Sequence, residues 1–399
     1  MTTATISLPP VQRPYFMVAL VVAVGLFLHL LGSSGRSALL FVIGVALGFT
    51  LYHAAFGFTG AYRRAILEKD ISGVSAQLIM LAAAMLLFAP ILAQGAALGH
   101  GVAAAVAPVS VSMVFGAMIF GIGMQLAGGC GSGTLFTAGG GNLRMVLVLA
   151  FFCAGGLWAS LDLHWWRELP GIGEISLGEQ LGWGRAIFLQ MVALGLIYLG
   201  LRLFGADNKR PLWWVGAFTW QRLLRGPWPL LFGAGMLALL NWATLVVAGH
   251  PWSITWAFTL WGAKTAMAFG WDPATSVFWS GGFPRAALIR PVLEDVTSLM
   301  DIGIVCGAFM AASLAGKVAP NARIPLPSLL AAAVGGLLLG YGARLAYGCN
   351  IGAFFSGVAS TSVHGWAWIV AAAVGNVIGV RLQPLFGINK AEPQANGRF

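Results

Sequence analysis

Residues Gly116 to Phe136 read GAMIFGIGMQLAGGCGSGTLF, and residues Gly335 to Phe355 read GGLLLGYGARLAYGCNIGAFF. Nine of the twenty-one positions are identical without a gap. The identical pairs are Gly116/Gly335, Gly121/Gly340, Gly123/Gly342, Leu126/Leu345, Ala127/Ala346, Gly129/Gly348, Cys130/Cys349, Gly133/Gly352 and Phe136/Phe355. Glycine and alanine are common here, but cysteine, with four copies in 399 residues, is rare and also aligns. The match indicates an internal repeat.

The composition surrounding this repeat is that of a membrane protein. Apolar residues make up 59% of the chain, charged residues 9%, and the mean hydropathy is +0.85. A soluble domain is about a quarter charged, so most of this chain must be in contact with lipid. The net charge of +10 comes from Lys and Arg in short loops between apolar runs, without a basic face. Nucleic acid is therefore excluded as a partner, and the loop cations instead mark the cytoplasmic side.

Eleven apolar runs have the length of membrane-embedded elements. They fall at 15–31, 38–60, 73–95, 108–136, 143–161, 185–204, 229–248, 252–270, 297–316, 327–355 and 364–387. The runs at 38–60 and 252–270 contain Gly, aromatic and polar positions and are predicted to re-enter the membrane without crossing it. With nine spans, fifteen Lys and Arg residues face the cytoplasm and five face outward, whereas eleven spans give twelve and eight. The positive-inside rule thus favours nine spans in a bacterial inner membrane, with a periplasmic N-terminus and a cytoplasmic C-terminus.

The repeat divides the chain into two halves of opposite orientation. Residues 15–161 form the first repeat and 229–387 the second, each with four spans and one re-entrant element. Residues 162–228 supply a periplasmic loop, a connecting helix and a cytoplasmic loop, and 1–14 and 388–399 are terminal segments. One connecting helix after four spans inserts the second half upside down. The predicted fold is therefore an all-α inverted repeat with broken half-helices, an architecture typical of transporters, whose sites lie where the halves meet.

In each copy of the repeated motif a helix runs into a glycine-rich sequence, GGCGSG or YGCNIG, and is predicted to break at the cysteine. Irregular backbone at membrane depth is tolerated where it lines a cavity or is buried in protein. Ser132 and Asn350 are the predicted N-caps of the half-helices that follow, whose positive ends attract anions. The predicted substrate path consists of Cys130, Cys349, Gly129, Gly131, Ser132, Gly133, Gly348, Asn350 and Gly352.

The two aligned cysteines are expected to be neutral thiols, because apolar surroundings disfavour the thiolate. Neutral thiols are weak hydrogen-bond donors suited to a sulfur-bearing anion, which a thiolate would repel. Arg344, Lys264 and His250 are candidates for electrostatic support, since cations inside a membrane are usually functional. Cys153 and Cys306 lie outside the motifs and are expected to be packing residues. Asp301 is the one acidic candidate well inside an apolar run.

Other chemistry finds no support in the sequence. The chain has no C-x-x-C and no His near a cysteine at a metal-ligand spacing, so zinc, haem and iron–sulfur sites are not expected. No catalytic residues and no cofactor are predicted, and the chain is not expected to be an enzyme.

The motifs resemble those of the YeeE/YedE-type membrane proteins, over nearly the whole chain. The resemblance is carried by Phe120–Gly133, by Gly342–Gly352, and by Gly249–Trp252 through Leu260–Lys264 to Gly270–Pro273. It implies an inverted-repeat importer that passes thiosulfate between Cys130 and Cys349 by S–H contacts. It also implies a cytoplasmic sulfur-carrier protein of the TusA-like kind as acceptor. Characterised importers have a further cysteine nearer the N-terminus, whereas this chain has none before Cys130.

Three alternatives stay open at this point. The substrate is another sulfur or selenium species, or the protein is a membrane thiol oxidoreductase, or it is an assembly subunit or unrelated anion transporter in which both cysteines are incidental. The missing C-x-x-C counts against the oxidoreductase.

Overall fold

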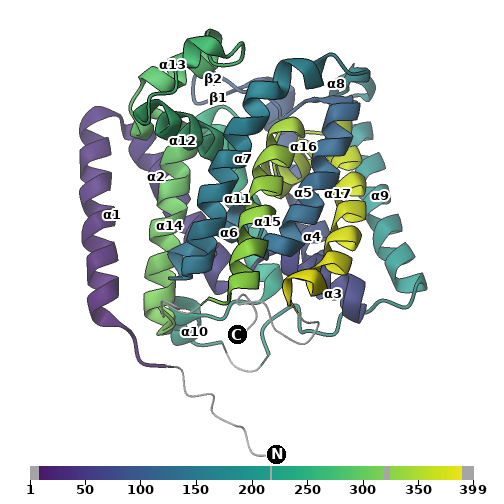
Figure 1. Cartoon of the computed structure of the whole chain (residues 1–399). Helices are drawn as coiled ribbons and strands as arrows, with labels where there is room; N and C mark the ends of the chain where they lie inside the picture. Colours follow the sequence, from purple (N-terminus) through teal and green to yellow (C-terminus); the bar gives the residue numbers. More distant parts are fainter. Residues whose placement is uncertain (1–8, 216–217, 319–323, 389–399) are drawn as a thin grey trace, which may run out of the picture.

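The computed structural model describes residues 9–215, 218–318 and 324–388, and this part of the chain is almost entirely helical (Figure 1). Within these ranges, ten segments are long and apolar enough to cross a membrane. They are α1 (Arg13–Ser33), α2 with α3 (Gly35–His53 and Phe58–Glu68), α4 (Ser72–Gln94), α5 with α6 (Val111–Ala127 and Gly131–Gly139), α7 (Leu143–Arg167), α9 (Trp183–Leu203), α11 (Leu230–Ala248), α14 (Val296–Ala315), α15 with η3 and α16 (Leu326–Leu345, Asn350–Phe355 and Ser356–Ala359), and α17 with η4 (Val363–Leu382 and Gln383–Phe386). The predicted class, an all-α polytopic membrane protein, is confirmed.

The remaining elements are short. They are β1 (Ala96–Ala97), β2 (His100–Gly101), β3 (Pro108–Ser110), β4 (Gly171–Glu174), α8 (Leu177–Leu181), α10 (Trp220–Arg225), α12 (Thr255–Ala268), η1 (Pro273–Thr275), α13 (Gly282–Ile289) and η2 (Val292–Glu294). The strands form two antiparallel pairs, with Ala96 opposite Gly101 and Pro108 opposite Glu174. With 14 residues, α12 is too short to span a membrane, as predicted for the re-entrant element at 252–270.

The run at 38–60 does not re-enter, and this prediction is corrected. It contains α2, which starts at the upper end of the bundle, and the break that leads into α3 at the lower end (Figure 1). The glycines that suggested an irregular element serve a close helix contact instead. A Cβ atom on Gly44 would lie 2.5 Å from Met300 O, and one on Gly48 would lie 2.0 Å from Ile304 O. Small residues let α2 and α14 approach backbone to backbone.

The tenth crossing changes the relation between the chain ends. Helix α1 begins and η4 ends at the same end of the bundle, the lower one in Figure 1. Backbone contacts agree, because Gln12 N donates to Ser313 O at the end of α14, 3.0 Å away. The prediction of termini on opposite sides required an odd number of crossings. It is wrong because 38–60 was counted as re-entrant.

Two helix contacts in the bundle have the same form. A Cβ atom on Gly155 of α7 would lie 2.3 Å from Leu337 O of α15, and one on Gly375 of α17 would lie 2.0 Å from Met118 O of α5. Leu337 follows Met118 by the same spacing that relates Gly335 to Gly116. Thus α15 packs against α7 as α5 packs against α17.

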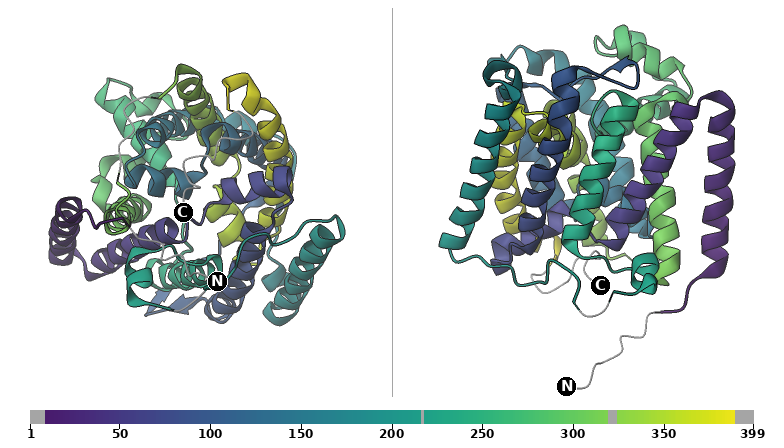
Figure 2. Two further views of the ribbon diagram at one scale, coloured as in Figure 1. Left: turned by 90° about the horizontal axis from the view of Figure 1, so that it is seen from below. Right: turned by 180° about the vertical axis from the view of Figure 1, so that it is seen from behind.

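The outer helices follow the same scheme. Helix α1 packs on α14, and α9 packs on α4. In each of these two outer helices, 17% of the residues in the most apolar 18-residue stretch are buried. Figure 2 shows α1 and α9 at opposite edges of the bundle. In Figure 1, α3 lies toward the lower end and α12 toward the upper end. The chain therefore surrounds its centre with pairs of elements in opposite orientations.

Candidate functional site

Both repeated motifs interrupt a helix in the interior of the protein. Helix α5 ends at Ala127, and Gly128 follows with φ +80° before α6 begins. Helix α15 ends at Leu345, and Tyr347 and Gly348 follow with φ +60° and +148° before η3 begins. Positive φ is readily adopted by glycine, which explains why these breaks are rich in it. The predicted breaks are present.

Each cysteine is itself the N-cap of the short helix that follows it. Cys130 has φ −96° and ψ −163°, and Cys349 has φ −102° and ψ −165°. The Cys130 carbonyl accepts from Thr134 N and the Cys349 carbonyl accepts from Ala353 N, both at 2.9 Å. The prediction that Ser132 is an N-cap is therefore wrong, because this residue already lies within the first turn of α6.

Asn350 is corrected in the same way. It is the first residue of η3, and the cap position belongs to Cys349, whose extended backbone fits it. The Cys349 sulfur takes the role of a capping oxygen, since Ile351 N donates to Cys349 Sγ at 3.4 Å.

The two cysteines lie in one buried region. A Cβ atom built on Gly131 would lie 3.1 Å from Cys349 Sγ, 3.4 Å from Ile254 Cγ2 and 3.5 Å from Thr255 Cγ2. Gly131 directly follows Cys130, so the start of α6 touches both the second cysteine and the start of α12. Cys130 is 1% exposed and Cys349 is 0% exposed. All four cysteines are free thiols.

Backbone N–H groups surround these thiols. The N–H groups of Gly133 and of Phe58, the first residue of α3, face the Cys130 thiol. Those of Ile351 and Gly352 face the Cys349 thiol. Helices α3, α6, α12 and η3 therefore all begin around the cysteine pair. Helix N-termini carry a partial positive charge and free N–H donors, so this centre attracts anions.

Polar side chains complete the centre. The Cys130 sulfur lies 3.5 Å from Ser132 Oγ, and Asn350 Nδ2 donates to Tyr62 Oη at 3.4 Å. Asn350 Oδ1 has no hydrogen-bond partner among the described residues. Gly129 lies against Thr134, and Gly133 lies against the Cys130 sulfur. A Cβ atom on Gly352 would lie 3.4 Å from Ser253 Oγ. Small residues thus keep side-chain bulk away from both thiols.

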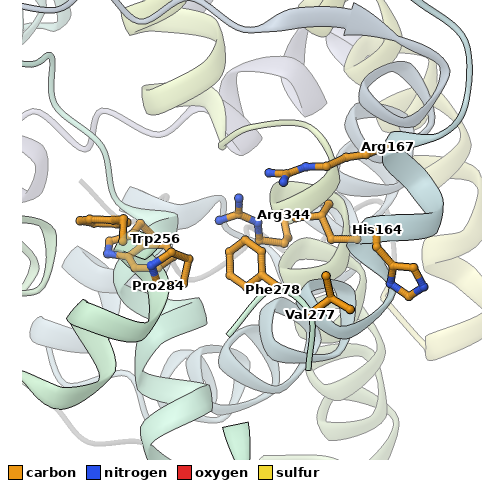
Figure 3. A pocket seen from close by; sticks show the side chains of 9 residues that line it. His164, Arg167, Trp256, Val277, Phe278, Pro284 and Arg344 are labelled. Carbon is orange, nitrogen blue, oxygen red and sulfur yellow. The ribbon is translucent and has the colours of Figure 1, made fainter. Parts of the chain in front are cut away.

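A cavity of about 540 Å³, whose lining side chains are drawn in Figure 3, includes residues of α12 and α13, which lie at the upper end of the bundle in Figure 1. Its lining residues are Leu163, His164, Arg167, Trp256, Val277, Phe278, Phe283, Pro284 and Arg344. The guanidinium carbon of Arg344 is 4.9 Å from the Phe278 ring centroid and 5.9 Å from that of Trp256. Arg167 is within electrostatic range of Arg344, and Figure 3 shows both guanidinium groups on the same side. The cavity is therefore electropositive.

Two residues of the cavity lining are close in the sequence to residues of the cysteine region. Trp256 is the second residue of α12, next to Thr255, and Arg344 precedes Cys349 by five residues. Arg344 Nε is buried and has no hydrogen-bond partner within the described ranges. Of the three predicted supporting cations, Arg344 is thus the one placed in a cavity.

The other two residues predicted to give electrostatic support, Lys264 and His250, lie against backbone carbonyls. Lys264 Nζ donates to Leu288 O at 2.7 Å and Arg290 O at 2.6 Å, which ties α12 to the end of α13. His250 Nδ1 lies 3.0 Å from Pro251 O. The structure does not bring either side chain to the cysteine pair.

Sequence reasoning missed Tyr62, the N-terminus of α3, and the pair His164 and Arg167. One signal was present for α3. The short similarity between Phe56–Ala61 and Phe258–Ala263 spans the start of α3 and lies inside α12, two helices that both begin at the centre. His164 and Arg167 had no signal, because they stand at the end of an ordinary span. The described residues contain no cluster of His, Cys, Asp and Glu able to hold a metal.

A bundle of membrane-length helices that is interrupted at its centre by anion-attracting helix N-termini defines a polytopic membrane transport protein. The comparisons agree with this class: the profile of the Sulphur transport family matches residues 53–378, and the chain belongs to this family.

The relatives are named as transporters and not as enzymes. The probable transporter YedE of Escherichia coli (strain K12) is 33% identical over 181 residues, 44% of this chain and 43% of that protein. The match thus spans less than half the length of that relative. The thiosulfate transporter TsuA of Spirochaeta thermophila is 26% identical over 355 residues, 84% of this chain and 95% of that protein. TsuA of Escherichia coli is 26% identical over 84% of this chain and 91% of its own length.

Proposed function

We propose that this protein imports thiosulfate, or a closely related sulfur-containing anion, across the bacterial inner membrane. The observation that carries the proposal is the closeness of Gly131, at the start of α6, to the Cys349 sulfur, which a Cβ atom on Gly131 would approach to 3.1 Å, at a point where four helices begin. N–H donors hold the oxygen atoms of an anion, and neutral S–H groups are soft donors to its terminal sulfur. The names of the TsuA relatives support the choice of thiosulfate.

In the proposed path the anion first enters the electropositive cavity beside Arg167 and Arg344. It then passes to the Cys349 thiol and from there to the Cys130 thiol, near Tyr62 and the start of α3. Each step exchanges one set of hydrogen-bond donors for another, so the charge is never left without partners in the apolar interior. The thiols form no covalent bond in this scheme.

The internal repeat is part of the proposal, with wider bounds than 15–161 and 229–387. The matching contacts support α1–α7 as one unit and α9–α17 as the other, with α9 as the counterpart of α1. In this arrangement 162–228 contains the start of the second unit and is no separate connector. Transporters of this architecture hold their substrate where the units meet.

For the orientation we infer that the lower end in Figure 1 faces the cytoplasm. Described cations at or near the lower end are Arg13, Arg63, Arg64, Lys69, Arg144, Arg202, Lys209, Arg210, Arg222, Arg225, Lys317 and Arg381. Those near the upper end, apart from the carbonyl-bound Lys264 and the buried Arg344, are Arg36, Arg167, Arg185, Arg285 and Arg290. The positive-inside rule then places both chain ends inside and the Arg344 cavity outside. A TusA-like acceptor would meet the anion at the lower end.

Uptake of radiolabelled thiosulfate into proteoliposomes that contain only this chain tests the proposal. We expect uptake that excess unlabelled thiosulfate abolishes and that sulfate, which lacks a terminal sulfur, does not. Sulfite and selenite serve as further competitors, because the same donors would accept a selenium species. Absence of uptake would reject the function, whereas stronger competition by sulfate or selenite would reassign the substrate.

A further inference from the structure

One buried acidic side chain has no role in the path described so far. Asp301 lies in α14, is 0% exposed, and neither of its carboxyl oxygens has a hydrogen-bond partner among the described residues. Two other acids with low exposure, Asp70 and Asp295, have partners. Asp70 is 2% exposed but binds Ser72 and Arg210, and Asp295 accepts from Trp256 Nε1 at 3.0 Å and from Ser298 N at 2.8 Å.

Asp301 faces the substrate region. Val305 and Ala308, four and seven residues further along α14, share its helix face. A Cβ atom on Gly139 of α6 would lie 2.8 Å from Val305 O and 3.0 Å from Ala308 Cβ. The face that carries Asp301 therefore packs on α6, the half-helix that Cys130 caps. Asp301 is also within electrostatic range of Cys349.

Among the described residues, those within electrostatic range of Asp301 are one acid and two thiols. Its titratable neighbours are Asp295 on α14, Cys153 on α7 and Cys349. Basic side chains and histidines on the helices packed around Asp301 bind backbone carbonyls elsewhere or are exposed. In α2, Arg36 binds the carbonyls of Val247 and Ala248, and His53 binds that of Leu224. Lys264 of α12 binds the carbonyls of Leu288 and Arg290, Arg225 of α10 binds that of Leu314, and His29 of α1 is exposed. A carboxylate here would lack any partner, so the neutral acid is the stable form at rest.

Import of a dianion needs an energy source. A membrane potential that is negative inside disfavours internal accumulation by roughly 50-fold per negative charge for each 100 mV. Co-import of one proton cancels one of the two negative charges and adds the energy of an inward proton gradient, and buried acids of this kind are the proton carriers of many transporters. We propose that Asp301 binds a proton from the outside and releases it inside with each anion imported, so that uptake is proton-coupled. This inference rests on the proposed function.

The cavity that holds Arg344 approaches the start of the helix that carries Asp301. Asp295 receives the indole N–H of Trp256, and Trp256 lines the cavity that holds Arg344. Asp295 is half-buried and is the acidic neighbour of Asp301 on the same helix. The N-cap of α14, six residues before Asp301, therefore lies beside a side chain that lines the cavity proposed to admit the anion. The carboxyl gains and loses one proton in each cycle, and no other bond changes.

Two measurements on proteoliposomes separate coupling from transport. Counterflow of labelled against unlabelled thiosulfate without a gradient reports transport alone. Uptake driven by an interior one pH unit more alkaline reports coupling, and each coupled proton is worth about tenfold in the accumulation ratio. We expect native protein to show both activities, and Asp301→Asn to keep counterflow but lose the pH-driven accumulation. Cys306→Ser, on the same helix, is the matched control and keeps both.

Accumulation by Asp301→Asn equal to that of native protein would overturn the inference, as would native counterflow without any response to the pH gradient. In the second case the proposed function still stands. Absence of native counterflow rejects the proposed function and the inference together. Should Asp301→Asn fail to assemble, the native protein decides, because thiosulfate entry must acidify an interior loaded with a pH-sensitive dye.

Discussion

Gly131 and Cys349 are 218 positions apart in the sequence, yet a single methyl group on Gly131 would touch the Cys349 sulfur, at 3.1 Å. The distance is short because α6 and η3 begin at the same point in the interior, one in each half of the chain. Gly131 therefore lies directly between the two cysteine-capped half-helices. In the proposed path, the anion that moves from one thiol to the other passes this residue.

Gly131→Ala should block transport without unfolding the protein. The new methyl group would occupy the space between Cys349, Ile254 and Thr255, and these neighbours can shift by the few tenths of an ångström required. We expect thiosulfate uptake to fall by about tenfold or more, since the donors on either side no longer meet at one anion. The control is Gly235→Ala on α11, where an added Cβ meets nothing within 4 Å. Equal uptake by the two variants would contradict a path past Gly131.

Serine variants of the cysteines distinguish a transport path that uses the thiols from one in which the cysteines are incidental. Cys130→Ser and Cys349→Ser keep the size and the capping geometry but replace a soft S–H donor with a hard O–H donor. We expect each to stop growth of a sulfur-starved host on thiosulfate, and Cys153→Ser to leave growth unchanged. Cys153 is partly exposed on α7 and contacts Gly262 of α12 through its backbone carbonyl, so its thiol is not needed there. A host that grows with all three variants would point to an unrelated anion.

The breaks at the cysteines could be predicted because their cause is local. Glycine-rich sequence ends a helix wherever it stands, and Gly128 and Gly348 adopt the positive φ that ends these two. The aligned cysteines in two halves of opposite orientation then predicted a common centre. The exact caps were missed because Ser and Asn are better cap formers than Cys in general, whereas here the backbone at Cys130 and Cys349 decides.

The crossing of α2 could not be predicted because its cause is distant in the sequence. Gly44 and Gly48 look like helix breakers until Met300 and Ile304 of α14 are seen to pack on them. Likewise, nothing near Lys264 shows that its ammonium group binds the carbonyls at the end of α13. These contacts depend on the tertiary arrangement, which also places the start of α1 and the end of η4 at the same end of the bundle.

Arg344 should act on substrate capture more than on turnover. Its guanidinium group lines the outer cavity and stacks over Phe278, so it contributes positive potential where the anion enters. Arg344→Gln removes the charge but keeps most of the side chain's volume. We expect the KM for thiosulfate uptake to rise about tenfold with a smaller change in the maximal rate. Arg285→Gln, an exposed cation of α13 outside the cavity lining, should leave KM near its native value. A fall in maximal rate alone would place Arg344 elsewhere in the cycle.

Asp70 makes the lower face of the protein sensitive to acid. Its carboxyl oxygens accept from Ser72 Oγ at 2.6 Å and pair with Arg210 Nε at 3.3 Å, which ties the turn between α3 and α4 to the loop after α9. Burial alone would raise the pKa of Asp70, but the hydrogen bonds from Ser72 and Lys209 and the charge of Arg210 outweigh it and lower the pKa.

A lowered folded-state pKa means that the stabilisation is complete above the ordinary value of about 4 and is lost as the pH falls through the folded-state value. Melting of the detergent-solubilised protein between pH 7 and pH 3 checks this. Native protein should lose stability at the acid end, and Asp70→Asn should be less stable at pH 7 but show a flatter profile. Asp207→Asn, an exposed acid in the same loop, is the control and should follow the native curve. An equally steep acid transition in Asp70→Asn would show that another carboxyl causes it.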